Sequence, residues 1–556
     1  MSLSGLVIGT YLAVLLVLAV YGLHRTALIS MYYRNRHRRP RPAGRFSELP
    51  AVTVQLPLYN EMYVVERLLD AVAGIRYPRD RFQIQVLDDS TDETQEICKR
   101  KIADLGARFP ELDIQYVHRT DRTGFKAGAL HHGLETAKGE FIMIFDADFV
   151  PTADILERCI DSFTDPKVAV VQCRWEHVNR NYSSLTEVQA LMLDGHFIME
   201  HAGRNWSGRF FNFNGTAGMW RRSAIADAGD WQHDTLTEDM DLSYRAQLRG
   251  WKFVYLPEIT APAELPVEMS AFKSQQFRWA KGSVQVAKKL LGTILRSGAT
   301  WEQKTEAFFH LTNNLAYPLL LVLSLLLLPN LALRTHHGWR EVLMIDFPLF
   351  FGTTLSVASF YLASQREIAL LRDPNAKPRF QWRVLARLPL VMSIGIGLCV
   401  NQTRAVLEAL AGKETEFVRT PKHGIGASDS TWWSKKYRAA KSVTPFIELG
   451  MAAYFVVAIA VAFDHGHYLS LPFLGLFLCG FGYVGWVSLW QGGVGVSMRH
   501  AFARVLGRGG SVVVPPPAYP VSPLPPLAHP VISVRRKAVT GEIIRADAPS
   551  LRAPSL

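Results

Sequence analysis

Two carboxylates, Asp146 and Asp148, follow directly after the apolar run 141–145. In an extended chain, side chains two residues apart point to the same side, so both carboxylates can face one ligand. Oxygen ligands suit Mg²⁺ and Mn²⁺, and magnesium typically takes one or two carboxylates together with substrate phosphates. The pair therefore predicts a divalent cation that neutralises charge on a departing diphosphate. Taken alone, the motif is equally compatible with two acids in a surface turn.

Asp88 and Asp89 close a second apolar run, 82–87, and Thr91 and Asp92 follow them. One interpretation is a polar turn in which Thr91 or Asp92 caps the next helix. The functional interpretation is that Asp88 or Asp89 contacts a nucleoside. The two interpretations are compatible, and both stay open.

The triplet Thr237-Glu238-Asp239 begins a segment that we expect to be helical as far as Gly250. Thr237 suits the N-cap position and acids in the first turn favour the helix dipole, so capping alone could explain the triplet. An inverting group transfer, however, needs a carboxylate that takes the proton of the attacking hydroxyl. Asp239 is our candidate for that base.

Gln275, Arg278 and Trp279 stand at positions i, i+3 and i+4, so they share one face of a helix. The guanidinium of Arg278 suits a diphosphate, and Trp279 offers a flat surface for a sugar ring. The alternative is an amphipathic interfacial helix with an aromatic anchor.

The elements that must position these side chains alternate between short apolar runs and helical stretches. Over residues 51–266 this alternation predicts an α/β domain with a mostly parallel sheet. Ligands of such sheets bind beyond the carboxyl ends of the strands, where the acidic motifs fall. The expected strands are 51–56, 82–87, 114–117, 141–145 and 168–172, and the expected helices are 61–73, 92–105 and 126–137.

Long apolar segments on both sides of this domain predict a membrane protein. Residues 6–23 carry no charged side chain, and about 20 apolar residues cross a bilayer core. Six arginines follow between residues 34 and 45, whereas a signal peptide carries its charge first. The positive-inside rule then places the N-terminus outside and the following domain in the cytoplasm. Further apolar segments lie at 308–333, 342–363, 446–463 and 469–490.

We expect five spans, with six as the alternative. The segment 388–400 has only 13 uncharged residues, which suits an interfacial or buried position better than a span. With five spans, the loop 366–383 and a basic tail with Arg499, Arg504 and Arg508 both lie inside. We therefore expect a multi-pass protein of a bacterial inner (plasma) membrane. Its parts would be a transmembrane helix (1–30), a cytoplasmic catalytic domain (50–266), an amphipathic helix (267–300), a membrane and interfacial region (305–492) and a Pro-rich disordered tail (509–556).

The net charge of +12 lies largely beside apolar segments, where anionic lipid and topology explain it. Neither zinc-finger spacing nor an aromatic-basic recognition motif accompanies it, so we expect no nucleic-acid partner. The five cysteines are scattered without a C-x-x-C pair, which suits a reducing cytoplasm.

In their order and spacing, the motifs resemble those of the processive family 2 glycosyltransferases: cellulose synthases, hyaluronan synthases and their cellulose-synthase-like relatives. The resemblance covers about Val52 to Lys422. Its motifs are Leu56-Pro57-Leu58-Tyr59-Asn60-Glu61, Asp88-Asp89, Asp146-Ala147-Asp148, Thr237-Glu238-Asp239 and Gln275-x-x-Arg278-Trp279.

This resemblance implies a GT-A catalytic fold and a role for each matching residue. Donor binding would fall to Tyr59, Glu61, Asp88, Asp89, Lys126 and Asp146. Asp148 would be the direct metal ligand, together with Asp146, and Asp239 would be the base. The acceptor and diphosphate end of the site would be lined by Glu238, Gln275, Arg278 and Trp279.

The segment Phe417-Val418-Arg419-Thr420-Pro421-Lys422 resembles the cellulose-synthase gating loop, F-x-V-T-x-K, which closes over the donor in that family. Phe417, Thr420 and Lys422 match the pattern, whereas Arg419 replaces the usual Val. That replacement puts the detailed action of the loop in doubt, and a basic surface loop is the alternative.

Residues 213–216 and 417–422 look most like those of mannan and glucomannan synthases. The resemblance therefore implies a hexose donor, UDP-glucose or GDP-mannose, and an inverting transfer to a growing β-linked polysaccharide, coupled to export. Expected partners are the donor, a glycan or lipid acceptor, the membrane and accessory export or regulatory subunits. The rival enzyme adds one sugar to a membrane lipid, and a receptor or scaffold with an inactive transferase domain is the alternative outside enzymes.

Overall fold

The structure is a computed structural model, and it describes residues 3–333, 347–373, 375, 381–425, 432, 435–437 and 442–494. The expected Pro-rich tail, the basic residues Arg499, Arg504 and Arg508, and the first residues of the apolar segment 342–363 lie outside these ranges. The predictions made for those residues stay predictions.

A seven-stranded mixed sheet forms the centre of the catalytic domain, in the order β3-β2-β1-β4-β6-β5-β7. β6 runs antiparallel to both of its neighbours, and the other pairs are parallel. The expected α/β fold with a mostly parallel sheet is thereby confirmed, although β6 and β7 are not among the expected strands. The strands are β1 (Val52–Leu58), β2 (Phe82–Asp88), β3 (Asp113–His118), β4 (Phe141–Ile144), β5 (Val168–His177), β6 (Gly218–Arg221) and β7 (Lys252–Ala263).

The register of the sheet aligns the ends of its central strands. Val52 at the start of β1 lies opposite Phe82 of β2 and Phe141 of β4, and Leu58 at the end of β1 lies opposite Asp88. Parallel strands in this register bring their carboxyl ends to one edge of the sheet. The polar residues that follow each strand therefore meet there, as expected for a ligand site.

Helices cover both faces of the sheet, so its central strands are buried on both sides. One face of β1 and β2 is apolar, and the other carries the buried polar side chains Thr53, Gln55, Gln83 and Gln85, which hydrogen-bond to one another in pairs. The helices α2 (Val65–Ala73), α3 (Thr94–Arg108) and α5 (Ile155–Ile160) pack on one face. The other face packs against α4 (Phe125–Thr136), α6 (Ser184–Gly195), α8 (Arg222–Asp227) and α9 (Glu238–Leu248). Between α6 and α7 (Ala202–Trp206), the chain makes a π-helical turn, η4 (His196–His201).

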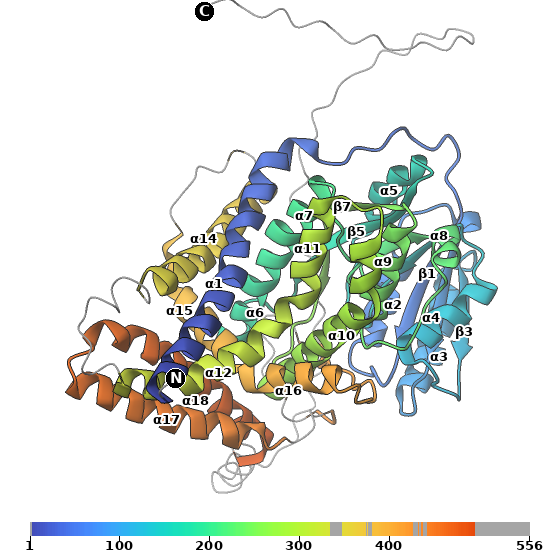
Figure 1. The fold of residues 1–556 in the computed structure, drawn as a ribbon. Coiled ribbons are helices and arrows are strands. Elements are labelled where there is room, and N and C mark those ends of the chain that lie inside the picture. The colour runs from blue at the N-terminus through green and yellow to red at the C-terminus, as the bar shows by residue number, and fades with distance from the viewer. Residues whose placement is uncertain are drawn as a thin grey trace, which may run out of the picture. The chain divides into compact units, whose positions relative to one another are not determined.

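The remaining helices form the apolar part of the chain, which Figure 1 shows at the end of the molecule away from the sheet edge formed by β3. The long helix α10 (Met269–Arg296) leads from the catalytic domain towards it. The others are α1 (Leu3–Asn35), α11 (Trp301–Thr312), α12 (Ala316–Leu333), α14 (Phe347–Arg372), α15 (Trp382–Gly397), α16 (Cys399–Leu410), α17 (Thr444–Asp464) and α18 (Leu471–Leu489).

Four helical stretches in the described part of the chain are long and apolar enough to cross a membrane: Ser4–Arg38, Trp301–Leu333, Thr444–Asp464 and Tyr468–Gly492. They match four of the five expected spans. The segment 388–400, expected to be interfacial, crosses the 41° bend between α15 and α16, a bent pair that could serve as a further span. The described residues 347–363 of the expected span at 342–363 form the first part of α14. Several long apolar helices thus indicate a membrane protein, and the assignment of the fifth span stays a prediction.

Candidate active site

A cavity of 180 Å³ lies beyond the carboxyl ends of β1, β2 and β4. Its other walls come from the start of α9, the first half of α10 and the segment 417–422. Every residue of the predicted site lines this cavity except Asp88. The fold therefore brings together motifs that lie far apart in the sequence.

Asp88 and Asp89 take different places. Asp88 is fully buried, and its carboxylate accepts hydrogen bonds from the Ser90 backbone N–H (2.9 Å) and the Tyr116 hydroxyl (2.7 Å). Asp89 faces the cavity and forms a two-point ion pair with Arg119, whose Nε lies 2.8 Å from Oδ1. Asp88 thus shapes the turn, and Asp89 is the one of the two that is placed to meet a ligand.

Asp146 lies just past the end of β4 and faces the ammonium group of Lys126. Its backbone N–H donates to the Thr216 hydroxyl (2.8 Å), while Lys126 also donates to the carbonyl oxygen of Gly215 (2.9 Å). Burial disfavours the charge of Lys126, but Asp146 and Glu238 together hold its pKa above the usual value. This corner of the cavity therefore keeps a permanent positive charge beside the carboxylate.

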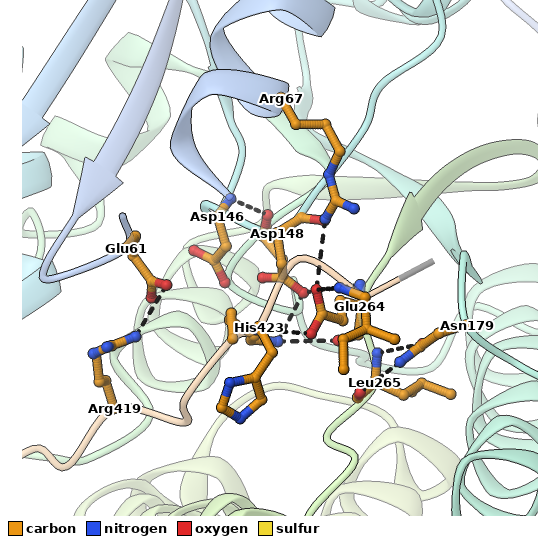
Figure 2. Close-up of polar contacts among 12 residues, drawn as sticks. Glu61, Arg67, Asp146, Asp148, Asn179, Glu264, Leu265, Arg419 and His423 are labelled. Atoms are coloured by element: carbon orange, nitrogen blue, oxygen red, sulfur yellow. Dashed lines mark hydrogen bonds and ion pairs between the residues drawn. The ribbon is translucent and has the colours of Figure 1, made fainter. Parts of the chain in front are cut away.

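The segment 417–422 reaches into the cavity and forms ion pairs with two of its acids. Lys422 Nζ lies 2.7 Å from Asp148 Oδ2, and Arg419 Nη1 lies 3.0 Å from Glu61 Oε2, the pair drawn at the left of Figure 2. Burial raises the pKa of Glu61 to about 8, and the charge of Arg419 opposes that shift. Arg419, the departure from the gating-loop pattern, therefore supplies a contact that Val could not make.

Glu264 anchors the end of this segment, as Figure 2 shows. Its two carboxylate oxygens accept hydrogen bonds from the backbone N–H groups of His423 (2.9 Å) and Ile425 (3.0 Å). Its own N–H donates to Asp148 Oδ2 (3.1 Å), and Arg67 Nη2 lies 3.7 Å from its carboxylate. One acid after β7 thus ties the segment to the predicted metal ligand.

Gln275, Arg278 and Trp279 lie on α10 and all face the cavity, as their helical spacing predicts. Arg278 donates to the carbonyl oxygen of Val418 (3.2 Å), and its guanidinium lies 4.5 Å from the centre of the Phe417 ring. Trp279 and Asp239 also line a second cavity. The helix therefore links the segment 417–422 to that second cavity.

Glu238 and Asp239 form the first turn of α9, after Thr237 at the N-cap position. The Thr237 hydroxyl makes no capping hydrogen bond and, among the residues that the structure describes, is buried without a partner, so capping by this side chain does not explain the triplet. Burial, and next the neighbouring charge of Glu238, raise the pKa of Asp239 to about 7. A carboxylate with a pKa near neutrality is suited to accept and release a proton.

Several lining residues escaped the sequence analysis. They include Glu264, described above, and Trp175 and His177. Each is a single residue of a common type without a spaced partner, so the sequence carries no signal for it. Asn214 also lines the cavity and belongs to the segment 213–216, which the resemblance singles out. Arg122 lines it too, and its guanidinium lies 3.4 Å from the centre of the Tyr59 ring.

Asp146 and Asp148 fit a divalent cation only in combination with substrate oxygens. Within the described residues, there is no group of three or more His, Cys, Asp or Glu side chains that could hold a metal ion. Mg²⁺ needs only one or two carboxylates when phosphate and water complete its shell. The buried hydroxyl of Thr420 lies in the same cavity wall and has no hydrogen-bond partner in the described part of the chain, so polar capacity remains for a ligand.

Comparison with known proteins gives the family. Residues 50–282 match the model described as glycosyltransferase like family 2. A glucomannan 4-β-mannosyltransferase of Arabidopsis thaliana (number 2) is 35% identical over 468 residues, which are 79% of this chain and 82% of that protein. A glucomannan 4-β-mannosyltransferase of Oryza sativa subsp. japonica (number 1) is 33% identical over 460 residues, 79% of this chain and 84% of that protein. Both are plant proteins, which gives no support to the expected bacterial membrane.

Among solved structures, a mannosyltransferase from Pyrobaculum calidifontis in complex with GDP-mannose and Mn²⁺ is similar at 21% identity and a TM-score of 0.47. It covers 73% of this chain and 100% of its own. The likeness to the plant enzymes, over about four fifths of each chain, confirms the resemblance found in the sequence. The chain belongs to glycosyltransferase family 2, in its cellulose-synthase-like group, and is a transferase that acts on a nucleotide sugar.

Proposed function

We propose that the chain is an inverting mannosyltransferase that extends a 4-β-linked mannan or glucomannan from GDP-mannose. The observation that carries this proposal is the position of Asp239, between a cavity rich in diphosphate partners and a second cavity suited to sugar. The names of the plant relatives favour a mannosyl donor over UDP-glucose.

In the proposed reaction, Asp239 takes the proton of an acceptor hydroxyl as its oxygen attacks the anomeric carbon. The bond from that carbon to the diphosphate breaks, and the configuration inverts. Lys126, Arg278 and Lys422 supply positive charge around the leaving diphosphate. A divalent cation held by Asp146 and Asp148 would neutralise further charge on the same group. Charge stabilisation and positioning then supply most of the rate enhancement, with roughly 10²–10⁴-fold from the base.

The donor end of the site is assigned in the same proposal. Tyr59, beneath Arg122, and Asp89 would hold the nucleoside, and Glu61 would come free when Arg419 moves. Phe417 and Thr420 belong to the segment that closes over the donor. Asp88 acts indirectly, by holding the turn that presents Asp89.

A second cavity of 270 Å³ supports elongation with export. It shares Asp239 and Trp279 with the first cavity and continues to Tyr317 at the start of α12 and to Gln402 on α16. Most of its polar lining consists of amides, and its aromatic lining includes Trp175 and Phe197. Amides and aromatic rings suit neutral sugars, so a growing chain could pass from the base towards the candidate membrane spans. We place the catalytic domain in the cytoplasm.

The test uses detergent-purified full-length protein with Mn²⁺ or Mg²⁺ and, in separate reactions, labelled GDP-mannose and UDP-glucose. We expect GDP-mannose to give a long product that a β-mannanase degrades, and Asp239→Asn to abolish transfer while nucleotide binding persists. A single labelled lipid would establish the rival lipid transferase. Polymer from UDP-glucose alone would overturn the donor assignment.

A further inference from the structure

Two histidines hold the side-chain amide of Asn214 from opposite ends. His201 Nε2 lies 2.7 Å from Asn214 Oδ1, and Asn214 Nδ2 lies 3.3 Å from His196 Nε2. An amide oxygen only accepts and an amide nitrogen only donates. His201 therefore carries its proton on Nε2, and His196 presents a bare Nε2.

Neighbouring charges fix these proton positions. His196 Nδ1 lies 2.9 Å from Glu200 Oε2, so this nitrogen carries the proton and leaves Nε2 as the acceptor. Although burial opposes its charge, the hydrogen bond from His196 and the charge of Arg204 hold the pKa of Glu200 well below the usual range. Burial, together with the charge of Arg204, holds the pKa of His201 well below its ordinary value, so this ring is neutral. If the Asn214 amide were reversed, its N–H groups would face the N–H of His201, and its oxygen would face the bare Nε2 of His196.

The π-helical turn is what makes this arrangement possible. His196 and His201 are five residues apart, and in an α-helix that spacing would separate them by about 140° around the axis. The turn η4 is π-helical, and its i→i+5 hydrogen bonding brings such residues to the same side. The two rings accordingly lie 4.3 Å apart between centroids. Single π-turns of this kind occur frequently at functional sites.

Asn214 stands immediately beside the candidate base. A Cβ built on the next residue, Gly215, would lie 2.9 Å from Asp239 Oδ2 and 3.4 Å from Lys126 Nζ. Asn214 lines both the donor cavity and the second cavity, and the buried Gln172 side chain holds its backbone N–H at 3.0 Å. Its second amide hydrogen has no acceptor within the part of the chain that the structure describes.

We propose that Asn214 binds a hydroxyl of the acceptor sugar beside Asp239, and that His196 and His201 are positioning residues that lock its amide in the productive orientation. The ligand class is a β-linked hexose chain with a free hydroxyl at the growing end. This inference rests on the proposed function and adds to it the residue that orients the acceptor. The nucleotide-binding end of the site does not depend on it.

The test measures acceptor and donor parameters separately, with detergent-purified full-length protein, GDP-mannose, Mn²⁺ and a β-1,4-linked mannohexaose acceptor. Loss of one neutral hydrogen bond typically corresponds to a roughly 2- to 12-fold change in binding. Asn214→Ala should raise the acceptor KM by about that factor, leaving the Kd for GDP within twofold. His201→Leu should act in the same direction. His201→Gln, whose amide can donate near the position of Nε2, should restore most of the acceptor affinity. His131→Gln, on the exposed side of α4, is the matched control.

Nucleotide-induced thermal stabilisation of each variant shows that the fold and the donor site persist. An unchanged acceptor KM in Asn214→Ala would overturn the proposal. So would equal effects of His201→Leu and His201→Gln, because a merely space-filling role would not distinguish a donor from an apolar side chain. A wild-type enzyme that hydrolyses GDP-mannose yet ignores the oligosaccharide would overturn the acceptor assignment alone. A wild-type enzyme without any donor turnover would overturn the proposed function itself.

Discussion

Asp239 links the activity of the site to the pH. Its pKa is raised to about 7 by burial and by the charge of Glu238, while Lys126 opposes the shift. Because a base works only when it is ionised, the transfer rate should rise with pH through about 7 and fall about tenfold for each pH unit below that. Glu238→Gln keeps the shape of the neighbouring side chain but removes its charge. The acid limb of the profile should therefore move to lower pH, by roughly one pH unit.

The same shift makes a statement about stability. In the unfolded chain, the Asp239 carboxyl titrates near 3.8, so between that pH and about 7 the folded state binds more protons than the unfolded state. The free energy of unfolding therefore falls as the pH rises across this window. One pKa unit corresponds to roughly 1.4 kcal/mol, so the full shift would be about 4 kcal/mol. Because Asp239 borders an open cavity, water screens part of this cost, and we expect about 1–3 kcal/mol.

Asp239→Asn should accordingly be inactive, yet more stable than the wild type at pH 8, with the difference shrinking towards pH 5. The assay combines initial rates between pH 5 and 9 with thermal unfolding followed by tryptophan fluorescence. Asp241→Asn is the control, because Asp241 lies on the same helix, is fully buried and pairs with Arg245 (2.7 Å) and Lys289 (2.9 Å). Asp241→Asn should be less stable than the wild type at pH 8, but the acid limb of its pH–rate profile should not move. Wild-type turnover in Asp239→Asn, or an unmoved limb in Glu238→Gln, would refute the reasoning.

Three further predictions concern other contacts. Gly215 has a φ of +76°, and in Gly215→Ala the added Cβ would lie 2.9 Å from the Asp239 carboxylate. The displaced base should lower kcat about 100-fold while GDP binding stays intact. A wild-type kcat would show that Asp239 is not held at this position. Lys422→Met frees Asp148 of its ammonium partner, so Mn²⁺ binding without nucleotide, followed by electron paramagnetic resonance, should tighten severalfold; weaker binding would contradict the pairing. Lys273 forms a buried ion pair with Glu448 at 2.6 Å, so Lys273→Met leaves the Glu448 charge without a partner. The free energy of unfolding, measured by thermal unfolding, should fall by about 3–5 kcal/mol, and the double variant with Glu448→Leu should recover most of that loss.

The sequence predicts those parts of the site whose chemistry needs a spaced motif. The pair Asp146 and Asp148, and the helical spacing of Gln275 and Trp279, place the side chains in one cavity because local geometry decides which way they point. The parallel core strands are equally predictable, since each is a short apolar run followed by polar residues. For these features, the local structure that the sequence predicts is enough to place the side chains correctly in the fold.

What could not be predicted depends on contacts between distant segments. The strand β6 is only four residues long and antiparallel, and its own sequence does not distinguish it from a loop. The ion pair between Arg419 and Glu61 and the anchoring of the loop by Glu264 join segments more than 150 residues apart. His196 and His201 would be assigned to different faces by the α-helical period, so the π-turn hides their cooperation from any periodicity argument.

The charges around the cavity indicate how donor binding would rearrange it. Lys126 is paired with Asp146, and Lys422 with Asp148, so two of the three proposed phosphate partners are each held by a proposed metal ligand. A nucleotide sugar that arrives with a divalent cation can satisfy all four groups at once, because the carboxylates turn to the cation and the ammonium groups turn to the diphosphate. Either ligand alone would leave one set of charges unpaired in a partly buried site, which is costly. We therefore expect the cation and the nucleotide to bind cooperatively, each tightening the affinity for the other by the same factor.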